Sequence, residues 1–144
     1  MQSNTAAGHQ FHRRAVHALA VATGLAFNSE VTFELGNSTK VHRFDLATPD
    51  GRYVGEAKAY AWTVSGNVPA AKISALREAV QYLDQLPDGV RRFIVMRRSV
   101  RISTGEALAD YFQRLNPQLF TSITLLELDD DGAIRVVCGT LPGP

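Results

Sequence analysis

Three ionisable residues have the types and spacing for phosphate chemistry. The stretch GRYVGEAKAY, residues 51–60, places Glu56 and Lys58 two positions apart, and ten residues separate Asp45 from Glu56. Two converging carboxylates suit Mg²⁺, which is usually held by one or two carboxylates together with waters and substrate phosphate. Such an ion can make hydroxide available near neutral pH, and a neighbouring ammonium can neutralise charge that builds on a phosphate. The three residues are therefore candidates for a cation site.

A hairpin must bring these side chains together. TPDG, residues 48–51, is a strong turn sequence, and predicted strands flank it. The period of two along a strand puts Glu56 and Lys58 on one face. A tight two-residue loop would place Asp45 opposite Val54 and diagonal to Glu56, about 7–8 Å away at the backbone. Both carboxylates could then reach one cation, provided that the turn has this length.

Apolar periodicity predicts the remaining elements. A polar arm, residues 1–8, is expected to be mobile and to precede a single domain, residues 9–144. Within it we expect a helix from His9 to Phe27, strands at 29–36, 40–48 and 52–62, a helix within 67–89, a strand at 90–100, a helix opening with a capping box at Ser103 and Glu106, and a hairpin within 122–139. A strand, a crossover helix and a further strand favour parallel pairing. The predicted fold class is α/β, with a mixed central sheet flanked by helices.

Composition limits the class of protein. A chain of 144 residues with 45% hydrophobic content fits one packed domain, and 15 basic against 14 acidic residues leave a formal charge of +1. No stretch reaches the ~20 apolar residues of a membrane helix, and the N-terminus lacks the pattern of a signal peptide. The single cysteine, Cys138, cannot form an internal disulfide. We expect a soluble, cytoplasmic protein that does not bind membranes.

The stretch FDLATPDGRYVGEAK, in an order of helix, three strands, helix and strand, resembles the PD-(D/E)XK nuclease superfamily, also called restriction-endonuclease-like. The likeness covers roughly residues 9–98, and Phe44-Asp45 matches the family's PD pair better than Pro49-Asp50 does. Gln81 and Tyr82 are similar to a Gln and a Tyr that follow the signature in some nuclease branches, although their spacing differs.

The resemblance implies roles for individual residues. Asp45 and Glu56 would bind Mg²⁺, with Mn²⁺ as a substitute, the Ala57 carbonyl could be a further ligand, and Lys58 would assist the attacking water. An extra acid would be Glu34 or Glu30, between which the sequence does not choose. The implied function is a hydrolase, a nuclease or endonuclease acting on nucleic acid, DNA more than RNA. A homodimer would suit double-strand cleavage.

Other interpretations stay open. A restriction-endonuclease-like module could keep the fold and bind nucleic acid or a protein without catalysis. Glu56 and Lys58 could also form a structural ion pair in an unrelated α/β fold. Arg97, Arg98 and Arg101 could hold a phosphate backbone or meet solvent at a strand end. Three histidines on the first helix fit a solvated face better than a zinc site, with phosphate contact as a lesser alternative: His9, His12 and His17.

Overall fold

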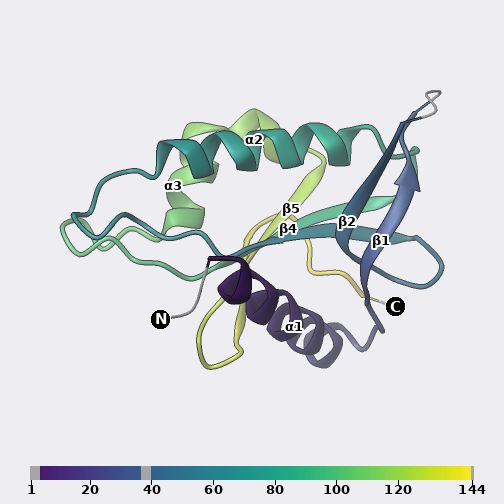
Figure 1. The fold of residues 1–144 in the computed structure, drawn as a ribbon, viewed down its shortest axis with the longest axis horizontal. Helices are drawn as coiled ribbons and strands as arrows, with labels where there is room; N and C mark the ends of the chain where they lie inside the picture. Colours follow the sequence, from purple (N-terminus) through teal and green to yellow (C-terminus); the bar gives the residue numbers. More distant parts are fainter. Residues whose placement is uncertain (1–3, 37–39, 144) are drawn as a thin grey trace.

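The computed structural model describes residues 4–36 and 40–143. One sheet with helices on both faces makes up the fold (Figure 1). In chain order the elements are α1 (Asn4–Thr23), β1 (Asn28–Glu34), β2 (Val41–Ala47), β3 (Tyr53–Lys58), α2 (Ala70–Asp84), β4 (Arg91–Arg97), α3 (Leu108–Leu115), the 3-10 helix η1 (Pro117–Phe120), β5 (Ile123–Leu128) and β6 (Ile134–Cys138). Within the described ranges, no helix has the length and hydropathy needed to cross a bilayer.

The sheet has six strands in the order β1-β2-β3-β4-β5-β6. Pairing is antiparallel from β1 to β3, parallel from β3 to β5, and antiparallel between β5 and β6. The predicted α/β class with a mixed sheet is confirmed, as is the αβββαβ order followed by an extra helix and a hairpin. Parallel pairing of β3 with β4 follows because the chain crosses over the sheet through α2.

Strand β4 shows why helices are needed on both faces. Phe93 and Val95 pack on the α1 side, whereas Ile94 and Met96 pack in the cluster that includes α2 and α3. All four side chains are buried, so the strand is apolar without alternation, as expected of a central parallel strand. Figure 1 shows α1 on one side of the sheet and α2 with α3 on the other.

Two predicted helix boundaries are wrong. Helix α1 begins at Asn4, within the arm predicted to be mobile, and ends at Thr23 instead of Phe27; residues 1–3 of that arm lie outside the described residues. The third helix begins at Leu108, and Ala107 precedes it without a side-chain cap. No capping box forms because the Glu106 carboxylate instead pairs with Arg114, at 3.0 Å.

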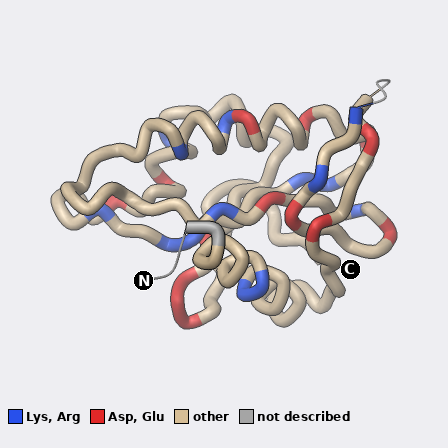
Figure 2. The backbone as a smooth tube through the Cα atoms, viewed as in Figure 1, with Lys and Arg blue, Asp and Glu red and all other residues tan. Residues whose placement is uncertain are grey.

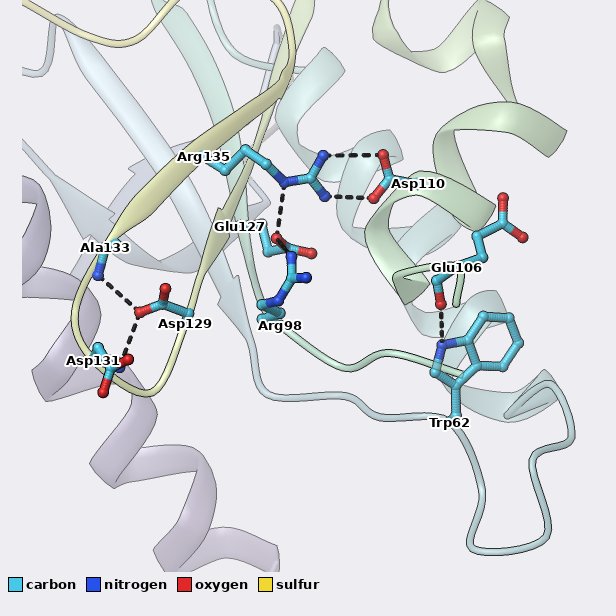
Figure 3. A network of polar contacts seen from close by, with 9 residues as sticks. All are labelled: Trp62, Arg98, Glu106, Asp110, Glu127, Asp129, Asp131, Ala133 and Arg135. Carbon is cyan, nitrogen blue, oxygen red and sulfur yellow. Dashed lines mark hydrogen bonds and ion pairs between the residues drawn. The ribbon is translucent and has the colours of Figure 1, made fainter. Parts of the chain in front are cut away.

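An ion-pair network around the buried Glu127 holds the C-terminal half of the sheet to α3 (Figure 3). Glu127 on β5 is 2% exposed, and its Oε1 accepts hydrogen bonds from Arg98 Nη1 and Arg135 Nε, each at 2.9 Å. Arg135 also pairs with Asp110 on α3, and both carboxylates raise the pKa of its guanidinium. Because a buried carboxylate is costly without partners, the two arginines are required for this strand to pack.

The approach of β3 to β4 leaves no room for a side chain at Gly55. A Cβ there would overlap the ring of Phe93, whereas a Cβ on Gly8 in α1 would meet nothing within 4 Å. We expect Gly55→Ala to lower the free energy of unfolding by about 1–3 kcal/mol, because the core is overpacked. Gly8→Ala should raise it by roughly 0.5–1 kcal/mol through helix propensity. Urea unfolding measures both, and equal stability of the two variants would contradict this packing.

Candidate active site

Strands β2 and β3 separate soon after their connecting turn. Only Leu46 with Gly55 and Ala47 with Val54 are paired, whereas β3 pairs with β4 along its whole length. The predicted register is wrong by two residues. TPDG does close a turn, with Gly51 N–H donating to Thr48 O at 2.9 Å, but strand pairing resumes only at Tyr53. If the observed register is extended by one residue beyond the Leu46–Gly55 pair, Asp45 lies across from Glu56 instead of Val54.

A local distortion reorients Asp45. Residues on either side of it pair with β1 in one register, yet Asp45 itself does not pair with Glu30. Glu30 has a φ of 54°, a left-handed conformation that is uncommon for residues other than glycine. Phe44 packs on the α2 side of the sheet and Leu46 on the α1 side, although residues two apart on a regular strand share a face. Asp45 therefore lies where β2 changes face.

The Asp45 carboxylate fills the split between the strands. Its Oδ2 accepts a hydrogen bond from the Ala57 N–H at 2.9 Å, in place of the backbone carbonyl that a paired β2 would have supplied. His12 Nε2 from α1 lies 3.6 Å from the same oxygen and 3.0 Å from the Ala57 carbonyl oxygen. With Nε2 protonated, His12 donates to that carbonyl. The split is thus closed by side chains, and each backbone group of Ala57 on this edge has a partner.

Glu56 is the buried acid of the site. Its residue is 3% exposed, its Oε1 lies 3.1 Å from His42 Nε2, and its Oε2 lies 3.9 Å from Lys58 Nζ. Burial, followed by the hydrogen bond and negative charge of Asp45, raises the pKa of Glu56 to about 9, although the Lys58 ammonium opposes the shift. Two carboxylates side by side cannot both ionise readily without a cation between them or beside them.

His42 joins the site although no motif in the sequence singled it out. Its ring stacks on Tyr82 of α2, with centroids 3.8 Å apart and an interplanar angle of 10°. Burial and the Lys58 charge lower the pKa of His42, which favours a neutral imidazole. The available signal was strand alternation, which places His42 with Phe44 on the face under α2. Of the Gln81-Tyr82 pair, Tyr82 reaches the site through His42, whereas Gln81 is exposed.

A cavity opens beside Lys58. It has a volume of about 400 Å³ and lies between the first turns of α1, the end of β3 and the start of α2. The Lys72 ammonium on α2 lies 5.1 Å from the centroid of the Tyr60 ring in the same wall. The side chains that give the cavity its chemistry are His12, Lys58, Tyr60 and Lys72. The ammonium groups of Lys58 and Lys72 and the imidazole of His12 could bind a phosphate. The two carboxylates next to them could bind a cation that contacts the same phosphate.

The structure does not bring every predicted residue to this site. Glu34 is exposed on the edge strand β1 opposite Val41, and Glu30 is exposed as well. Arg97 pairs with Asp130 at 3.5 Å, and Arg98 with the buried Glu127. A further cation, Arg101, donates from Nε to Gly66 O at 2.7 Å and lies over the Trp62 ring. Each of these arginines has a structural partner, and the guanidinium groups of Arg97 and Arg98 also remain partly exposed.

The donor set fits a hard, partly hydrated cation. Across residues 4–36 and 40–143, no three His, Cys, Asp or Glu side chains are grouped to hold a metal ion. Mg²⁺ needs fewer protein ligands than three, because waters and substrate phosphates complete its octahedral coordination. Asp45 and Glu56 meet that requirement with two adjacent carboxylates, one of them buried and poorly ionised on its own. The Ala57 carbonyl faces His12 here and would have to exchange that contact to act as a ligand.

The raised pKa of Glu56 predicts how stability changes with pH in the absence of divalent metal. The unfolded side chain ionises near 4.5, whereas the folded one keeps its proton to about 9. The folded state therefore binds more protons in this window, and its stability falls as pH rises through it. Glu56→Gln, which keeps the shape and removes the charge, should flatten that loss and melt higher than the parent near pH 8, but not near pH 4.

Thermal melts across pH in the presence of a chelator test this expectation. Glu34→Gln is the matched control, since Glu34 is exposed and should leave the parent's pH profile unchanged. A parent and a Glu56→Gln variant with parallel profiles from pH 4 to pH 9 would show that Glu56 is not held protonated by its surroundings.

Comparison with known proteins does not identify a family for this site. No protein-family model, no curated protein and no solved structure matches the chain. The likeness to PD-(D/E)XK nucleases rests on the residues of the 44–58 segment and on the order of the elements, and it stays a prediction.

Proposed function

We propose that the protein is a metal-dependent nuclease that hydrolyses phosphodiester bonds in nucleic acid, DNA in preference to RNA. The observation that carries the proposal is the placement of Asp45 against the buried Glu56 where β2 and β3 separate, with Lys58 3.9 Å from the Glu56 carboxylate. Mg²⁺ is the expected cofactor, and Mn²⁺ a substitute. A bound cation would favour ionisation of both adjacent carboxylates, which supports a binding role for the pair.

The chain's own residues suggest a division of labour. Asp45 and Glu56 would hold the ion, which when bound polarises a phosphoryl oxygen and lowers the pKa of a water. Lys58, which lines the cavity, would orient that water or stabilise charge on the phosphate. His12 positions the Ala57 peptide, and His42 fixes the Glu56 carboxylate while Tyr82 holds its ring. These last three residues act through others and are positioning residues.

The charge distribution supports a polyanionic substrate in spite of the formal charge of +1. Segments 57–77 and 89–105 contain eight of the 15 Lys and Arg residues and none of the 14 Asp and Glu residues. Lys and Arg, blue in Figure 2, lie along both segments; Lys58 ends β3 next to Glu56 and Arg97 ends the parallel strand β4, whereas Arg91 and Arg92 lie at the start of β4. Phosphate contacts of this kind supply affinity that does not depend on sequence. A homodimer placing two such sites on a duplex stays a prediction.

Metal binding is the first test. We expect millimolar Mg²⁺ or Mn²⁺ to raise the melting temperature of the parent, because only the folded state holds both carboxylates together. Asp45→Ala and Glu56→Ala should abolish that rise. Asp84→Asn, which removes an exposed acid at the end of α2, is the matched control and should keep it. Glu34→Ala tests the predicted extra acid, since loss of the rise would place Glu34 in the site.

Cleavage is the second readout of the same variants. Lys58→Ala should retain the metal-dependent rise in melting temperature but lose about 100-fold or more in cleavage of labelled DNA, as expected when a transition-state contact is removed. A rise without cleavage of any DNA or RNA would favour the alternative of a module that binds nucleic acid or a protein without catalysis. No rise in the parent, together with no cleavage, would contradict the proposed function.

A further inference from the structure

Two neighbouring turns present fully exposed aliphatic side chains. Val64 follows β3, Ile102 follows β4, and their relative exposures are 110% and 101%. Val64 is in the turn closed by Gly66 N–H to Thr63 O at 2.8 Å, and Ile102 is in the turn closed by Gly105 N–H to Arg101 O at 2.7 Å. Single exposed aliphatic side chains are common on protein surfaces, but here two of them, both β-branched, lie at the tips of neighbouring turns.

The two turns are tied together and do not project independently. Arg101 Nε donates to Gly66 O at 2.7 Å, and its guanidinium carbon lies 4.8 Å from the centroid of the buried Trp62 ring. Trp62 in turn donates from Nε1 to Glu106 O at 3.1 Å and from its backbone N–H to Ser99 Oγ at 3.1 Å. The Trp62 to Glu106 contact is visible in Figure 3. We call these joined turns, residues 62–67 and 99–106, the double turn.

The double turn is continuous with the candidate active site. The chain leaves β3 directly after Lys58 and leads into the first turn, and the residues that flank this turn, Tyr60, Ala61 and Pro69, line the same cavity as Lys58. Val64 lies six positions after Lys58 in the chain, so the tip lies within roughly 20 Å of this lysine. That distance corresponds to about six base pairs along a duplex axis, at 3.4 Å per base pair.

The surroundings of the tips suit a polyanion better than a protein. Within 57–77 and 99–106 the only acid is Glu106, which pairs with Arg114 at 3.0 Å, and Ser65, Asn67, Ser103 and Thr104 beside the tips are neutral hydrogen-bonding side chains of the kind that contact phosphates. Two isolated aliphatic side chains offer far less than the roughly 800 Å² per partner of a specific protein interface. They match the apolar wedges with which proteins part base steps in the minor groove.

We infer that the double turn is a wedge for double-stranded nucleic acid, with Val64 and Ile102 pressed between base steps close to the strand being cut. This inference deepens the proposed nuclease function and rests on it. It identifies the substrate as a duplex that is deformed on binding. A preformed wedge explains why the fold keeps the two turns rigid and leaves their apolar tips bare.

Base unstacking tests the wedge directly. The probe is a short DNA duplex with 2-aminopurine at several adenine positions, whose fluorescence rises when a base loses its stack. We expect Lys58→Ala protein, which should bind without cutting, to raise this fluorescence. Val64→Ser with Ile102→Ser in the same background should weaken binding by about ten-fold, measured by anisotropy, and abolish the rise. Val21→Ser is the matched control, because Val21 is 73% exposed on α1 and should change neither signal.

The outcomes separate the wedge from the nuclease. Unchanged binding and fluorescence in the double variant would overturn the wedge but leave the nuclease proposal, which the metal-dependent melts and cleavage decide. Binding of the duplex without any fluorescence rise in the Lys58→Ala protein would also overturn the wedge. A protein that shows the metal-dependent rise and cuts only single strands would overturn it as well, while keeping the metal site. Thermal melts of each serine variant confirm that the fold is intact.

Discussion

Two carboxylates held side by side at the point where β2 leaves β3 impose the central constraint on this structure. Asp45 and the buried Glu56 repel each other when both are ionised, and the pKa of Glu56 is raised accordingly. The Lys58 ammonium and the His42 imidazole lie next to the Glu56 carboxylate. A core built only for stability would place apolar side chains here, because buried charge contributes little net stability. The repulsion between the two carboxylates is local. The pair lies toward the carboxyl end of the parallel strand β3, the end at which α/β sheets bind ligands.

The rest of the fold holds that split open in a defined shape. Helix α1 supplies His12 to the Ala57 peptide from one face, and α2 supplies Tyr82 against His42 from the other. The two helices therefore do more than cover apolar surface: each fixes one side of the gap. At the far end of the sheet, the network around Glu127 fixes β5, β6 and α3 in the same way, so the parallel strands form a rigid base for the site.

Basic and acidic residues are concentrated in different segments of the chain. Segments 57–77 and 89–105 contain no acids, while the acidic residues lie elsewhere in the chain. Several arginines of these segments are used first within the fold: Arg92 donates to carbonyls at the end of α2, Arg98 to Glu127, and Arg101 to Gly66. Their remaining exposed surface can still attract a polyanion.

The sequence by itself determined the class of fold and most elements, because apolar period and turn chemistry are local: the alternation in 29–36 and the apolar run Phe93–Met96 behave as predicted, and TPDG forms a turn, although not the predicted two-residue hairpin loop. It also singled out Asp45, Glu56 and Lys58. Only the tertiary structure decided the strand register, since the loop between β2 and β3 contains two more residues than the predicted turn. It also decided that β2 changes face at Asp45. It alone decided that His12 and His42 join the site, because they approach through packing between elements that are 45 and 14 residues apart in the chain. No local sequence pattern predicts long-range packing, and it is this packing that brings Asp45, Glu56 and Lys58 together in one site.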